Sequence, residues 1–207
     1  VAVLESVGGR LLEVLTEAAG QFYDPGMVDW LLDRAAKTKG SGDDLKAFQA
    51  GVTQTAMKLA KPDQLATVKA AVDRYGSDDI EKKLFAQVEA QLKACGDRAA
   101  CYVAAIQKPE AQEQATQFIG VKAGYMIGIL GNDATRDELV GVIDGIGNAA
   151  VRFVAAQAID HLTPKGSKPV SDKLNAIISK NAKSADREKA AYDSPLKQVM
   201  YRIDARN

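Results

Sequence analysis

The chain has 207 residues, of which 46% are hydrophobic and 6% aromatic, and its 27 basic residues balance its 27 acidic residues. A net charge of zero gives no general attraction to nucleic acid or to an acidic membrane surface, so we expect neither as a partner. No apolar run in the sequence approaches the roughly 18 residues that a membrane-spanning helix needs. The length is sufficient for a sizeable core, and a composition rich in Ala, Leu, Val, Lys and Gln favours helices.

In the N-terminal half, apolar residues recur at helical spacing, and turn residues separate the periodic segments. Asp24 and Pro25 predict a helix start, because Asp caps a helix and proline suits its first turn. The elements predicted in this half are a capping helix at 2–18 within the leading segment 1–22, a helix that begins near Asp24, a helix at 43–60, a helix that begins at Asp63, and a long helix at 78–95.

The C-terminal half continues the pattern. Thr135 and Glu138 have the spacing of a capping box, and Asn148 is placed to cap the helix after it. The elements predicted here are a short helix at 99–107, a helix at 110–130 bent at Gly120, a helix that begins at Thr135, a helix that begins after Asn148, a helix around 170–178, and a last helix at 186–205 that is disturbed at Ser194-Pro195.

Two stretches in this half resemble copies of one helix. Val121–Ile129 and Val151–Ile159 lie thirty residues apart. When the two stretches are aligned, Val121 matches Val151, Lys122 matches Arg152, and Ile129 matches Ile159. A helix with one apolar face cannot bury that face alone, and repeated units solve this by stacking. Predicted helix pairs open at intervals of 33 to 37 residues, near Gly26, Asp63, Ala99, Thr135 and Lys168. The sequence therefore predicts an all-α fold: one domain over 1–207, with about five helix pairs in a right-handed α-solenoid over 24–207.

The run Asn148-Ala-Ala-Val151-Arg152, followed by small apolar residues, resembles the HEAT-repeat family. The copy at Val121-Lys122 is the next best match, and the other units match in period and pattern only, which leaves an armadillo-type array as an alternative. The resemblance implies that the second helix of each pair lines a concave face that holds a partner, and it implies no reaction. It also implies that Arg152 bridges neighbouring repeats through an acidic residue. The alternative for Arg152 and Lys122 is a basic ladder along the groove.

Other motifs have simpler interpretations than catalysis. Gly145–Ala150 fits a dinucleotide fingerprint, but that motif needs a preceding strand, and a helix stop at Gly147 followed by the Asn148 cap explains the same residues. His161, the only histidine, lies beside Asp160 at a helix end, where a histidine suits the negative end of the dipole. We expect no enzyme, no cofactor and no metal site.

The two cysteines, Cys95 and Cys101, are too few for a metal site. Cys95 lies on a predicted apolar stripe with Ile80, Leu84, Val88 and Leu92, which indicates a buried core residue. A disulfide between the two cysteines, closing the turn at 96–100, is the other interpretation and would stabilise the fold by roughly 2 kcal/mol. The bonded form favours a periplasmic or secreted protein and the reduced form a cytoplasmic one. The start at Val1, without methionine, is consistent with a removed signal peptide or tag and is uninformative about export.

The function predicted from these features is a non-enzymatic scaffold that binds a protein partner of unknown identity. The candidate partner contacts are Lys122, Arg152, Phe153 and Gln157, chosen from their positions on the repeated helix. The alternatives are an accessory or lyase-type protein that positions a small ligand or chromophore, and a structural component of a cell-envelope assembly. An enclosed apolar pocket would favour the ligand-positioning role, and an open polar face would favour the scaffold. A disulfide between the cysteines would favour the envelope role.

Overall fold

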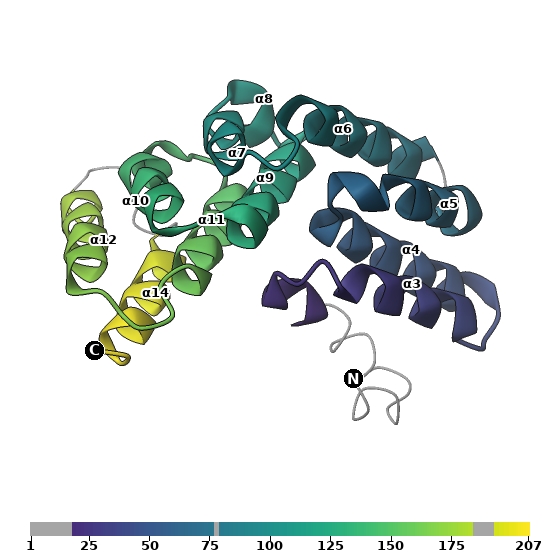
Figure 1. Cartoon of the computed structure of the whole chain (residues 1–207), viewed down its shortest axis with the longest axis horizontal. Coiled ribbons are helices and arrows are strands. Elements are labelled where there is room, and N and C mark those ends of the chain that lie inside the picture. The colour runs from purple at the N-terminus through teal and green to yellow at the C-terminus, as the bar shows by residue number, and fades with distance from the viewer. Residues whose placement is uncertain (1–17, 77–78, 184–192) are drawn as a thin grey trace. The chain divides into compact units, whose positions relative to one another are not determined.

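The computed structural model describes residues 18–76, 79–183 and 193–207, and helix labels follow Figure 1, where the described α-helices begin at α3. Over these residues the chain is all-helical and contains no strand, as predicted. The predicted capping helix at 2–18 lies outside the described residues except for Ala18, which leads into a short 3-10 helix, η1 (Gly20–Phe22). None of the helices described has the length and apolar character needed to cross a membrane.

The helices group into two compact units, Val1–Asp97 and Arg98–Asn207. Unit 1 and unit 2 are therefore described separately.

In the part of unit 1 that the structure describes, four α-helices pack on their neighbours in sequence. Helix α3 (Met27–Lys37) packs on α4 (Gly42–Leu59), and α5 (Leu65–Tyr75) packs on both α4 and α6 (Asp79–Cys95). A short 3-10 helix, η2 (Pro62–Gln64), precedes α5. The buried core of this unit includes Val28, Leu31, Ala35, Val52, Ala56, Met57, Leu59, Val68, Val72, Phe85, Val88 and Leu92.

The buried face of α6 differs from the predicted stripe. Ile80 is 62% exposed, whereas the next residue, Glu81, is only 4% exposed and accepts a hydrogen bond from Gln54 Nε2 at 3.0 Å. Cys95 is buried as predicted, and it is also joined to Cys101 in a disulfide. The sequence left these two interpretations as alternatives, and both hold.

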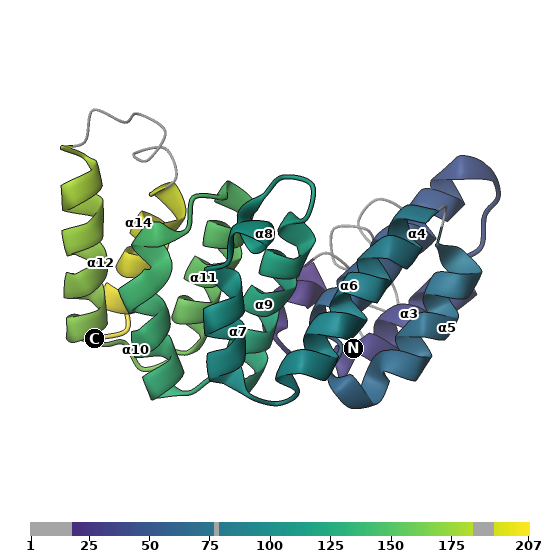
Figure 2. The same ribbon diagram turned by 90° about the horizontal axis from the view of Figure 1, so that it is seen from above.

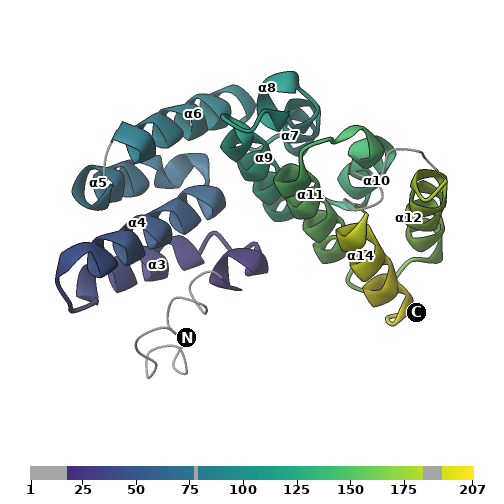
Figure 3. The ribbon, with the colours of Figure 1, turned by 180° about the vertical axis from the view of Figure 1, so that it is seen from behind.

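Unit 2 arranges its long helices in two rows (Figures 2 and 3). Its elements are α7 (Ala99–Ile106), α8 (Pro109–Gln112), α9 (Gln117–Leu130), α10 (Asp133–Val142), η3 (Ile143–Gly145), α11 (Ala149–His161), α12 (Lys168–Asn181) and α14 (Ser194–Asp204). In one row α10 contacts α7 and α12, and in the other α11 contacts α9 and α14. Across the rows α7 packs on α9, α10 on α11, and α12 on α14.

Helices α9 and α11 run side by side in the same direction, with glycines of α9 against apolar side chains of α11. A Cβ added at Gly120 would lie 2.7 Å from Val151 Cγ2, and one added at Gly124 would lie 2.7 Å from Val154 Cγ1. These neighbours are thirty or thirty-one residues apart, so the offset between the two sequence copies is also the spatial register of their helices. Glycine is needed here because any side chain would push the helices apart.

Replacement of Gly120 by alanine is expected to lower the free energy of unfolding of unit 2 by about 1–3 kcal/mol, because the new Cβ would overlap the Ala111 carbonyl oxygen and Val151. Urea denaturation followed by circular dichroism measures this. The matched control is Gly141→Ala in α10, where an added Cβ meets nothing within 4 Å. The control should leave stability unchanged or raise it by up to about 1 kcal/mol. Equal effects at the two sites would contradict the close packing of α9 on α11.

Two predicted helix boundaries in unit 2 are wrong. The chain breaks after α8 ends at Gln112, so there is no single bent helix at 110–130, and Gly120 is buried inside α9. Helix α10 is capped by Asn132, whose Oδ1 accepts a hydrogen bond from the Thr135 backbone N–H at 3.1 Å. Thr135 is therefore a buried first-turn residue, because Asn132 is an equally good cap three residues earlier.

The final helix also begins later than predicted. Helix α14 starts at Ser194, so Pro195 lies in its first turn, where the missing N–H removes no helical hydrogen bond. The dipeptide Ser194-Pro195 is thus a helix start, and residues 186–192 of the predicted helix lie outside the described residues.

Candidate functional site

The structure separates the four predicted partner contacts into two buried and two partly exposed residues. Lys122 on α9 is fully buried, and Arg152 on α11 is 4% exposed. Phe153 is 39% exposed, and Gln157 is half-buried and accepts a hydrogen bond from Arg202 Nη2 at 3.3 Å. Because a buried side chain cannot touch a partner, Lys122 and Arg152 leave the candidate surface, and Phe153 and Gln157 stay on it.

The guanidinium of Arg152 is held entirely by groups of unit 2. Its Nη1 donates to the backbone carbonyls of Ile143 at 2.9 Å, Asp144 at 3.2 Å and Ile146 at 3.3 Å. Its Nη2 donates to Asp193 Oδ1 at 2.5 Å, and Asp193 is 1% exposed. Asp193 directly precedes α14, so this ion pair joins α11 to the next helix of its row. The ion pair links α11 to the start of α14, and Arg152 has almost no exposed guanidinium surface.

The side chains of Asp144, Asn181 and Lys180 also belong to this group. We call the whole group the Arg152 cluster: Arg152, Asp144, Asp193, Asn181 and Lys180. Asn181 Nδ2 donates to Asp144 Oδ1 at 3.0 Å and to Asp193 Oδ1 at 3.3 Å. The hydrogen bond from Lys180 Nζ to Asp144 Oδ2, at 2.8 Å, is the main cause that lowers the pKa of Asp144. The cluster links η3, α11, the end of α12 and the start of α14.

Lys122 is fully buried, and this burial lowers the pKa of its ammonium group well below the ordinary value of 10.5. Between the lowered pKa and 10.5, the unfolded chain binds a proton that the folded chain lacks. The contribution of Lys122 therefore makes the fold more stable as the pH rises through that window and least stable below it.

Lys122→Met is expected to remove this contribution to the pH dependence of stability. The wild-type chain should therefore gain stability relative to the variant as the pH rises toward 10.5. Urea denaturation of both proteins at pH 7 and pH 10 measures this difference. The control is Lys173→Met on the exposed side of α12, which should show no such change between the two pH values. A stability difference between wild type and Lys122→Met that is the same at both pH values would contradict this effect of burial.

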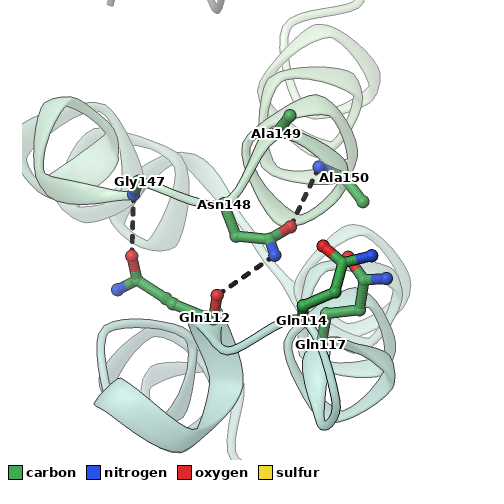
Figure 4. A pocket seen from close by; sticks show the side chains of 7 residues that line it. All are labelled: Gln112, Gln114, Gln117, Gly147, Asn148, Ala149 and Ala150. Atoms are coloured by element: carbon green, nitrogen blue, oxygen red, sulfur yellow. Dashed lines mark hydrogen bonds between the residues drawn. The ribbon is translucent and has the colours of Figure 1, made fainter. Parts of the chain in front are cut away.

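A polar pocket of about 630 Å³ lies in unit 2 where two chain segments meet (Figure 4). We call it the glutamine pocket, and it is lined by Gln112, Gln114, Gln117, Gly147, Asn148, Ala149 and Ala150. Gln112 ends α8, Gln114 lies in the turn after it, and Gln117 begins α9. The other residues are the first two of α11 and the two that directly precede it. Four of the lining residues lie in the Gly145–Ala150 stretch that was considered as a dinucleotide fingerprint. The glutamines were not predicted as a site, and their only local signal is three glutamines within six residues.

Hydrogen bonds hold the two sides of the pocket together. Gln112 Oε1 accepts from the Gly147 backbone N–H at 2.7 Å, and Asn148 Nδ2 donates to the Gln112 carbonyl at 3.1 Å. Asn148 Oδ1 also accepts from the N–H groups of Ala150 at 3.0 Å and Val151 at 3.1 Å, which confirms the predicted cap. By contrast, the carboxamides of Gln114 and Gln117 hydrogen-bond to no other residue that the structure describes.

This arrangement can bind but offers no group for acid–base or nucleophilic chemistry, because every side chain lining the pocket is an amide or is aliphatic. The glycines of the dinucleotide fingerprint follow the 3-10 helix η3 and not a strand. The Asn148 cap also occupies N–H groups that a phosphate would need. The other motif considered for catalysis was His161 beside Asp160. The carboxylate of Asp160 forms ion pairs with Arg202 at 2.7 Å and with Arg206 at 2.9 Å.

Comparisons of the chain with protein-family models, with curated proteins and with solved structures find no match. The class of protein is therefore defined by the fold and the site alone. It is an all-α protein of two helical units, with a neutral polar pocket on the second unit.

Proposed function

We propose that the chain is a HEAT-like, right-handed α-solenoid protein that acts as a non-enzymatic protein-binding module. The observation that carries this proposal is the arrangement of unit 2, where α7/α9, α10/α11 and α12/α14 form three successive helix pairs in two rows. Stacked pairs of this kind bury a continuous core and leave extended surfaces for binding. The parallel register of α9 and α11, at the offset of the two sequence copies, supports the same conclusion.

The Arg152 cluster gives further support. The resemblance to HEAT repeats implies an arginine that joins neighbouring repeats through an acidic residue, and Arg152 bonds Asp193 at the start of the next helix of its row. Lys122 occupies the matching position of the other copy and is likewise buried. In this proposal both residues stabilise the array, and the partner contacts Phe153 and Gln157.

A binding role is favoured over the positioning of a small apolar ligand or chromophore. The latter would be supported by an enclosed apolar pocket, whereas the glutamine pocket is open and lined by amides. A structural role in a cell-envelope assembly is a second candidate, favoured by the Cys95–Cys101 disulfide, because such bonds persist in oxidising compartments.

The test of the module is capture of a partner by the whole chain from its native source, followed by reconstitution with the purified partner and measurement of the Kd. Phe153→Arg is expected to weaken the complex at least tenfold, because it places a charge in the contact. Ile80→Arg, on the exposed surface of α6 in unit 1, is the control and should bind normally. Failure to isolate any stoichiometric protein complex, together with recovery of a bound small molecule, would contradict the proposal.

A further inference from the structure

We propose that the glutamine pocket binds an extended, uncharged segment of a partner polypeptide through the main-chain amides of that segment. The inference deepens the proposed function and rests on it, since it names the site and the chemistry of the partner.

Gln114 and Gln117 have unused hydrogen-bonding capacity within the described chain. Figure 4 shows both side chains lining the pocket near the start of α11. Each carboxamide offers two donors and one acceptor oxygen, and neither is bonded to another part of the described chain. An extended main chain offers N–H donors and C=O acceptors in alternation, so paired carboxamides can satisfy both kinds of group.

The charge of the pocket lining restricts the ligand further. The pocket lining contains no ionisable side chain, so an ionic ligand would lose hydration without gaining a counter-charge. The N-terminus of α11 does not supply one, because Asn148 Oδ1 already accepts from the N–H groups of Ala150 and Val151. An apolar ligand is disfavoured as well, since it would leave the glutamine amides desolvated and unpaired.

The pocket is already formed in the unbound chain. Gln112 bonds both Gly147 and Asn148, so the start of α11 and the end of α8 are held at a fixed separation. A pre-formed site reduces the entropy that binding a flexible segment must lose. The volume of about 630 Å³ lies within the range typical of ligand sites and accommodates a short stretch of extended chain.

The experiment is a nuclear magnetic resonance titration of the ¹⁵N-labelled full chain. The side-chain NH₂ signals of Gln114 and Gln117 are assigned from the variants Gln114→Ala and Gln117→Ala. The probes are pools of hexapeptides of uncharged residues, acetylated and amidated at their ends, and matched pools with N-methyl groups at alternate residues. Sodium acetate and inorganic phosphate are the anion probes.

We expect at least one unmethylated pool to shift both glutamine signals, and we expect N-methylation to weaken that binding at least tenfold by removing backbone donors. The double variant Gln114→Ala/Gln117→Ala should lose binding by a similar factor. Gln198→Ala, on the exposed surface of α14, is the control and should bind normally. The inference is overturned if no pool shifts these signals, if acetate or phosphate shifts them instead, or if N-methylated peptides or the double variant bind equally well.

The two proposals fail separately. If the partner captured from the native source binds the double variant as tightly as the wild-type chain, the glutamine pocket is not its site and the module proposal stands. If no partner protein exists, the module proposal fails whatever the peptides do.

Discussion

Val151→Asp is expected to unfold unit 2 at room temperature. Val151 is fully buried and lies against Gly120, at a close approach of α9 to α11. A carboxylate at this position would lose its hydration, which is costly in an apolar contact. Substitutions of this kind belong to the small class that costs more than about 4–5 kcal/mol, which is close to the whole stability of a typical domain.

Far-UV circular dichroism and a thermal melt measure the effect. The matched control is Ala149→Asp, two residues earlier on the exposed first turn of α11. An acidic residue there interacts favourably with the helix dipole, so the control should melt at or slightly above the wild-type temperature. A Val151→Asp protein with wild-type thermal stability would show that Val151 is not a core residue.

Arg152→Ala is expected to destabilise unit 2 by about 3–5 kcal/mol, as is typical when one partner of a buried ion pair is removed. Asp193 would remain buried without its cation, and three carbonyl groups would lose the donor that Arg152 Nη1 supplies. Truncation of Lys180, which is 74% exposed in the same cluster, is expected to cost under about 1 kcal/mol.

The two units allow a sharper measurement of Arg152→Ala. Trp30 is the only tryptophan and lies in unit 1, so its fluorescence reports that unit, whereas circular dichroism reports all helices. We expect Arg152→Ala to shift the circular dichroism transition while Trp30 fluorescence changes little. The double variant Arg152→Met/Asp193→Leu should recover most of the loss, because it removes the unpaired carboxylate. If Arg152→Ala instead leaves stability intact and weakens partner capture, the groove-ladder interpretation of Arg152 is correct.

Local features of the sequence were sufficient for the helical class, for the Asn148 cap and for the thirty-residue offset between α9 and α11. These features depend on periodicity and on hydrogen bonds between residues two to four positions apart. Both can be recognised from the order of residues in the sequence. The same reasoning was wrong at Thr135, because Asn132 offers a competing cap three residues earlier. It was wrong at Ile80 because the rotation of α6 depends on the helices that cover it.

Tertiary structure alone decided which charged residues of the repeated helix are buried and which groups meet at the glutamine pocket. Lys122 and Arg152 occupy equivalent positions in the two copies, and their order in the sequence does not say whether such a position faces a neighbouring helix or solvent. Gln112 and Asn148 are 36 residues apart, and only the packing of unit 2 brings them into hydrogen-bonding distance. Burial and long-range hydrogen bonds are properties of several segments together, so periodicity within any one segment cannot specify them.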